Sequence, residues 1–173
     1  MANTFTKIAT VTVGSGGASS LDFTSIGSTY TNLCLKVSVR SNYATANWDN
    51  IRLTFNGSSS GYSSILLYGD GASASSVSSS GAAYVSLLYA TNANNTASTF
   101  ANLEIYIPNY AGSNNKSFSI DNVTENNATT ALAGLTAGLW ANTAAITQVT
   151  LVPNAGTSFV QYSTATLYGI KNA

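Results

Sequence analysis

Histidine is missing from this 173-residue sequence, and cysteine, proline and charged residues are scarce. Without histidine there is no Ser-His-Asp or Cys-His catalysis, no imidazole proton shuttle and none of the usual zinc sites. The single Cys34 cannot form an internal disulfide, and we interpret it as a small packing residue. Six Lys and Arg balance six Asp and Glu, so the basic excess of a nucleic-acid-binding protein is lacking. We expect no cofactor, no metal site and no nucleic-acid partner.

Long apolar runs are also absent. The longest, such as Ile65 to Tyr68, are only a few residues, whereas a membrane-spanning helix needs about 20. The N-terminal residues, MANTFTKIATVTV, alternate between apolar and polar and do not form the hydrophobic stretch of a signal peptide. We therefore expect a protein that is made in the cytoplasm and has no membrane partner.

Small neutral polar residues take the place of charge. Ser, Thr and Asn make up 66 of the 173 residues, while only 7% are charged, against about 25% in ordinary soluble domains. These residues favour strands, turns and loops over helix interiors, which predicts an all-β protein. The length and the 45% apolar content suit a single domain over residues 1–173. A net charge of zero weakens colloidal repulsion, so we expect a homo-oligomer.

Alternation with a period of two recurs along the whole chain. Leu33, Leu35, Val37 and Val39 share one face of a strand, with Lys36 and Ser38 on the other. Similar patterns predict strands at residues 9–13, 21–23, 51–55, 62–69, 82–90, 101–108 and 116–125. Asn56-Gly57 is a strong hairpin signal because both residues tolerate positive φ. About ten short strands with frequent turns predict a β-sandwich, jelly-roll-like in arrangement.

Two segments are harder to interpret. The Ser-, Ala- and Gly-rich stretch 69–83 is typical of a long flexible loop. In TTALAGLTAGLWAN, Leu132, Leu135 and Leu139 have helical spacing, and Thr129 or Thr130 would cap such a helix. However, Gly134 and Gly138 would each cost a helix about 1 kcal/mol, and the alternation from Leu135 to Leu139 also fits a strand, which we favour.

The carboxylates do not suggest an enzyme. A glycosidase needs two of them facing each other across a cleft. Asp121 and Glu125 are four residues apart on one strand face, about 13 Å, and we interpret them as a solvated pair. Asp70 lies in YGDGAS, which is more typical of a turn than of a calcium loop. The other carboxylates are Asp22, Asp49 and Glu104.

Aromatic side chains are the better candidates for binding. Ten Tyr and two Trp offer large apolar faces with a polar group, suited to sugar stacking or to subunit contacts. Core packing is the commoner role for any one of them. The candidate contacts for a protein partner or a glycan lie in predicted loops and are Tyr43, Trp48, Tyr110, Asn114 and Asn115.

Both ends of the chain carry a family resemblance. The C-terminal segment GLWANTAAITQVTLVPNAGTSFVQYSTATLYGIKNA contains W-x-N-T-A-A-I-T, then a hairpin, then a last strand ending in L-Y-G-I. It resembles the C-terminal signature of small β-sandwich structural proteins of tailed bacteriophages, including marine and cyanobacterial ones. The N-terminal FTKIATVTVGSGGASSLDFTSI resembles their opening strand pair. Tyr162 departs from the pattern, which has a small residue before the last strand.

The resemblance implies a virion structural protein with no catalytic residues. The resembled proteins include both tail-fibre and head-decoration components. Because the chain is one small domain without coiled-coil heptads or a fibre repeat, we expect a capsid decoration protein or head fibre on the particle surface, with major capsid or tail proteins as partners. The alternative is a tail-fibre or receptor-binding module that recognises a host surface glycan, and a polysaccharide depolymerase is a third possibility. The resemblance also implies that the first and last strands pair near each other. Ala9, Val11 and Val13 would then share a sheet with one face of the last strand, either Ala165, Leu167 and Gly169 or Thr166, Tyr168 and Ile170.

Overall fold

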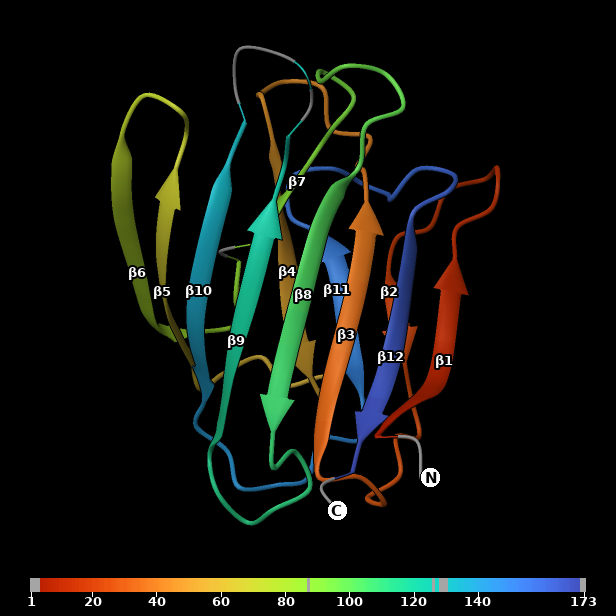
Figure 1. Cartoon of the computed structure of the whole chain (residues 1–173), viewed down its shortest axis with the longest axis vertical. Helices are drawn as coiled ribbons and strands as arrows, with labels where there is room; N and C mark the ends of the chain where they lie inside the picture. Colours follow the sequence, from red (N-terminus) through yellow and green to blue (C-terminus); the bar gives the residue numbers. More distant parts are fainter. Residues whose placement is uncertain (1–3, 87, 126, 128–130, 172–173) are drawn as a thin grey trace.

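The computed structural model describes residues 4–86, 88–125, 127 and 131–171. Over these residues the protein is all-β, with twelve strands in two antiparallel sheets, which confirms the predicted sandwich. Figure 1 shows the larger sheet in front of the smaller one. The large sheet has eight strands, in the spatial order β1 (Phe5–Thr12), β12 (Thr164–Ile170), β3 (Asn32–Val39), β8 (Ala101–Pro108), β9 (Lys116–Val123), β10 (Ala133–Trp140), β5 (Tyr62–Gly69) and β6 (Ala74–Ala82).

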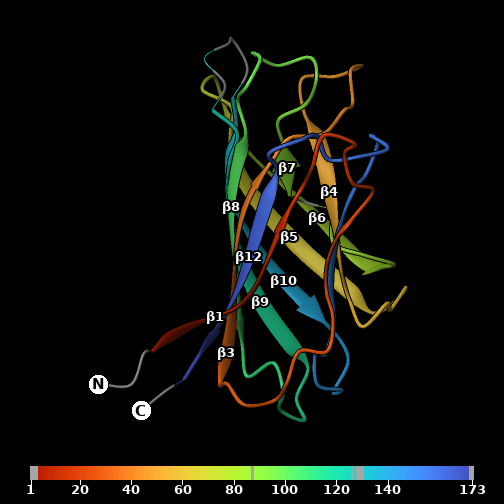
Figure 2. The same cartoon turned by 90° about the vertical axis from the view of Figure 1, so that its right-hand side faces the viewer.

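The small sheet has four strands and covers only part of the large one. Its order is β2 (Leu21–Phe23), β11 (Val149–Pro153), β4 (Asp49–Phe55) and β7 (Tyr89–Ala90). Figure 2 shows β4 and β7 on one side of the layer that contains β3, β8 and β12. The core lies between the sheets, because alternate side chains point to opposite faces and the apolar set of each strand points inward. Fully buried core residues include Leu35, Leu53, Ile105, Leu151 and Leu167.

The first and last strands pair as expected. Ala9 lies opposite Leu167, and Val11 lies opposite Ala165, in an antiparallel ladder. On its other side β12 pairs with β3, where Leu167 lies opposite Leu35. The strand β12 is therefore the second strand of the sheet, and its neighbour β1 forms one edge.

The ambiguous segment is strand β10, as the alternation predicts. Its two glycines lie at inward-facing positions, where side chains of neighbouring strands come close to the backbone. A Cβ on Gly138 would collide with the ring of Phe118, and a Cβ on Gly134 would come within 2.8 Å of a methyl carbon of Leu66. These glycines therefore serve packing. Thr129 and Thr130, the alternative helix caps, lie outside the described residues.

Other expectations need correction. The segment 69–83 is not a loop, because residues 74–82 form β6, paired with β5. The strand expected over 82–90 is not continuous over its described residues: Ala82 ends β6, Val85 forms an isolated bridge with Leu53, and Tyr89–Ala90 form β7, while residue 87 lies outside the described residues. Asn56 and Gly57 both have positive φ, 52° and 65°, but β4 and β5 on either side belong to different sheets. The dipeptide therefore turns the chain between layers and does not close a hairpin.

Candidate functional site

Large aliphatic side chains are exposed on the outer face of the large sheet. Alternation directs every second side chain of β5, β9 and β10 away from the core. Four of these are large and at least 44% exposed: Ile65, Leu67, Val123 and Leu135. Together with the exposed Ala133 and Ala137, we call them the apolar face.

The register makes the apolar face continuous. Leu135 on β10 lies opposite Leu67 on β5, and Ala137 lies opposite Ile65. On the other side of β10, Ala133 lies opposite Val123 of β9. Directly opposite residues on one sheet face are in contact distance of each other, so these side chains form one surface across three strands.

Small residues between the large ones hollow this surface. A shallow depression of about 500 Å³ is lined in part by Leu67, Gly69, Ala133 and Leu135. A second, of about 300 Å³, lies over Ile65 and its neighbours on β10. Both are open to solvent along the sheet, which suits the side chains of a docked protein better than an enclosed small molecule.

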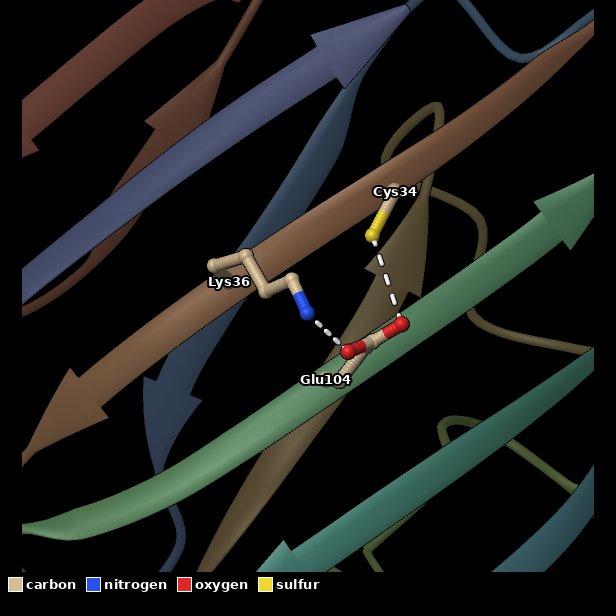
Figure 3. A network of polar contacts seen from close by, with 3 residues as sticks. All are labelled: Cys34, Lys36 and Glu104. Carbon is tan, nitrogen blue, oxygen red and sulfur yellow. Dashed lines mark hydrogen bonds and ion pairs between the residues drawn. The ribbon is translucent and has the colours of Figure 1, made fainter. Parts of the chain in front are cut away.

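A polar cluster adjoins the apolar face on β3 and β8 (Figure 3). The Lys36 ammonium forms an ion pair with Glu104 directly across the two strands. The Cys34 thiol donates to the other oxygen of Glu104 at 3.7 Å. Burial, with the nearby Glu104 carboxylate, raises the pKa of Cys34 to about 11, and the hydrogen bond to Glu104 raises the pKa of Lys36. At neutral pH the thiol is protonated and buried, which agrees with a packing role.

Two carboxylates lie side by side at the border of the apolar face. Glu104 on β8 is directly opposite Asp121 on β9, which in turn is opposite Leu135. The Glu104 carboxylate is engaged by Lys36 and Cys34. Both acids stand on the same open sheet face, whereas glycosidase carboxylates face each other across a cleft.

Tyr43 and Trp48 lie in the segment between β3 and β4, and both are half-buried. Trp48 packs edge to face against Tyr89, with ring centroids 5.8 Å apart, and Tyr89 packs against Tyr68 at 6.1 Å. The neighbouring buried Asp49 accepts hydrogen bonds from the backbone N–H groups of Ala155 and Gly156 at 3.0 and 2.9 Å. This carboxylate holds the loop after β11 against the segment that carries the two aromatics.

Tyr110 is not a surface residue. Its side chain is fully buried, its hydroxyl donates to the carbonyl of Gly27, and it accepts from the N–H of Tyr30 at 3.4 Å. The expectation of a loop aromatic that is open to a partner is therefore wrong for this position. Asn114 and Asn115 are exposed. Next to them, the buried Lys116 donates to the carbonyl oxygen of Gly112 at 2.7 Å, and burial lowers its pKa.

The five sequence-predicted contacts do not form one site. In the pairing of β3 with β8, Val39 lies opposite Ala101 at one end and Asn32 lies opposite Pro108 at the other. Tyr43 and Trp48 follow the first end, whereas Asn114 and Asn115 follow the second. Figure 1 shows the two connections at opposite ends of the sandwich.

The apolar face is a candidate functional feature that the sequence analysis did not predict. The signal was present, because β5 carries Ile65 and Leu67 between the inward Ser64, Leu66 and Tyr68, so this strand is apolar on both sides. Which side faces the core is decided by the position of the small sheet.

Comparisons of the chain with protein-family models, curated proteins and solved structures find no match. Among the residues that the structure describes, there is no cluster of three or more His, Cys, Asp or Glu side chains of the kind that holds a metal ion. The described part of the chain likewise contains no apolar helix long enough to cross a membrane.

Proposed function

We propose that this protein is a non-enzymatic structural subunit on the surface of a tailed-bacteriophage virion, a capsid decoration or head-fibre subunit that docks through its apolar face. The observation that carries the proposal is the exposure of Ile65, Leu67 and Leu135, at 53–61%, on one rigid sheet surface. Contiguous apolar patches on soluble proteins commonly mark interaction sites.

The shape and charge of the surface support a protein partner. The side chains project from three hydrogen-bonded strands, so little conformational entropy is lost when a partner covers them. The adjoining charges are few, and Lys36 is neutralised by Glu104. A capsid lattice presents many identical docking positions, so modest individual contacts give stable occupancy of the particle. The resemblance of both chain ends to phage structural proteins supports the choice of a virion.

Immunogold labelling of intact particles tests the location. An antibody against this chain is applied to virions of the phage that encodes it, and gold is counted on heads and tails. We expect dense label over the head. Label confined to the tail tip would favour the receptor-binding alternative, and particles without label would reject the virion proposal.

Variants of the apolar face test the mode of docking. Leu67→Asp and Leu135→Asp place charge in the centre of the surface, and we expect each to reduce the amount of protein bound to particles at least tenfold. Ser38→Asp on β3 is the matched control, because Ser38 is exposed on the same sheet face but lies opposite Asn102 and Thr164, away from the apolar face. Normal incorporation of both leucine variants would contradict docking through this face.

A second candidate function rests on the aromatic side chains of Trp48, Tyr68 and Tyr89, which pack together. Trp48 and Tyr68 are half-buried and both pack against Tyr89, and a group of aromatic side chains of this kind suits stacking against a sugar. A receptor-binding module would bind host glycan here. Glycan-array binding that is lost in Trp48→Ala and retained in Leu67→Asp would favour this function over capsid docking. Absence of binding to any glycan would remove it.

A further inference from the structure

The two edges of the large sheet differ in their protection. Edge strands present unpaired backbone groups and invite pairing with another chain, and proteins block them with Lys, Pro or bulges. The edge strand β1 carries the exposed Lys7 and an irregular register between Lys7 and Ala9. The edge strand β6 contains no charged residue and no proline over its nine residues. Its register with β5 is regular from Ser64–Ser79 to Gly69–Ala74 and shifts at one end, between Tyr62–Ala82 and Ser64–Ser79.

Strand β6 is also exposed on both faces. Within the described chain its neighbour in the sheet is β5 alone. In Figure 1 β5 and β6 extend beyond the strands of the small sheet. Val77, on the inward face and opposite Leu66, is consequently 40% exposed. A second strand beside β6 would therefore meet no obstruction from the small sheet.

We propose that two copies of this chain pair through their β6 strands, antiparallel about a two-fold axis near Ser78, to form one continuous sheet. Full overlap places Ala74 of one copy opposite Ala82 of the other, with the regularly paired residues Val77 to Ser79 of both copies around the axis. Val77 of one copy then lies diagonally across from Val77 of the other. At that separation, long side chains introduced at position 77 would reach each other. The other positions are mainly Ser and Ala, which pack without steric or charge conflict.

Charge complementarity favours a second copy as the occupant. One end of β6 is acidic, because Asp70 and Glu125 line the same depression there. The other end leads to Tyr84, and the Arg52 guanidinium lies 4.7 Å from the centroid of that ring. Antiparallel pairing brings the acidic end of each copy towards the Arg52 end of the other. The two Asp70 carboxylates remain roughly 30 Å apart, beyond the Debye length at physiological salt.

This pairing is separate from docking through the apolar face. A two-fold axis perpendicular to the sheet leaves both apolar faces on the same side, so a dimer would present two docking surfaces to one particle. The pairing can be tested on the isolated full-length chain, and its result does not depend on the virion proposal.

Solution mass measures the pairing. Sedimentation velocity of the wild-type chain should give about twice the 17.8 kDa chain mass, falling to the monomer on dilution. Val77→Lys and Val77→Glu should each be monomeric, since like charges meet near the axis, and their equimolar mixture should regain the dimer. Circular dichroism and melting temperature check that the variants fold. Thr10→Lys on β1 and Leu67→Lys on the apolar face are the controls and should stay dimeric.

Crosslinking tests the register independently. Ser78→Cys should form an intermolecular disulfide under mild oxidation, because residues nearest the axis face each other. Cys34 does not compete, since it is buried and its pKa is raised to about 11. Ser119→Cys, exposed on β9, should remain uncrosslinked.

Three outcomes would overturn the inference. They are a wild-type chain that is monomeric at all concentrations, a dimer that persists in Val77→Lys, and a dimer lost only in Leu67→Lys. The last would show that the apolar faces pair with each other. If the dimer behaves as expected but intact virions carry no gold label, only the virion proposal is rejected and the pairing stands.

Discussion

Leu167 in the last strand lies directly opposite Leu35 in β3, and both side chains are fully buried between the sheets. Because β12 is also paired with β1, it joins the first strand to the rest of the large sheet. The stability of this edge therefore depends on residues near both ends of the described chain.

Leu167→Ala should lower the free energy of unfolding by about 2–5 kcal/mol, because it removes buried methyl groups and leaves a cavity. Urea denaturation measures the change. Thr164→Ala on the outward side of the same strand is the control, with an expected change of about 0.5 kcal/mol or less. Equal effects of the two substitutions would contradict the burial of this strand.

Gly138→Ala should destabilise the protein by about 1–3 kcal/mol, because the added methyl group would overlap the Phe118 ring in a packed interior. Gly27→Ala is the matched control, since its Cβ would meet no atom within 4 Å and its φ is not positive. We expect that change to be neutral or slightly stabilising. Thermal melting compares the two. Adding Phe118→Leu to Gly138→Ala should recover part of the loss; an undiminished Tm for Gly138→Ala would reject the close packing.

Asp49→Ala should destabilise the protein by about 1–3 kcal/mol in total, because it removes the charged acceptor of two part-buried hydrogen bonds, from the N–H groups of Ala155 and Gly156. Hydrogen exchange of the Gly156 amide should accelerate more than exchange in β3. Asp121→Ala, at an exposed position, should change neither quantity. Unchanged exchange at Gly156 would show that Asp49 does not hold the loop.

Cys34 should make the protein less stable at high pH. The folded thiol has a pKa of about 11, above its ordinary value of 9.0, so the unfolded chain loses this proton first. Stability is full below pH 9 and falls by up to about 2–3 kcal/mol as the pH rises from 9 to 11. Other groups titrate in the same range, so the measurement is the difference in unfolding free energy between wild type and Cys34→Val.

Between pH 9 and 11, the unfolding free energy of the wild type should fall relative to that of Cys34→Val. Iodoacetamide should alkylate Cys34 slowly at pH 8 in the folded protein and rapidly in urea. Rapid alkylation of the folded protein would show that the thiol is neither buried nor held protonated.

Local patterns were enough to predict the fold class and most strands. Alternation is a property of neighbouring residues, because successive Cβ atoms point to opposite faces, so the inward positions of β3 and β8 can be read from their sequence. The same alternation, with the cost of Gly134 and Gly138 in a helix, correctly indicated strand β10. The pairing of β1 with β12 was expected from the resemblance of the chain ends.

The tertiary structure decided what local patterns do not encode. Strand β6 has almost no apolar alternation, and it is a strand because β5 supplies a hydrogen-bonded neighbour. Tyr110 is buried because it packs into the core between the sheets, where its hydroxyl donates to the carbonyl of Gly27, a residue 83 positions away. Ile65 and Leu67 lie on a strand with apolar side chains on both faces, and they form a surface because the small sheet covers the other side. Residue order determines which side chains share a face, whereas long-range packing determines which face, which edge and which loop remain open to a partner.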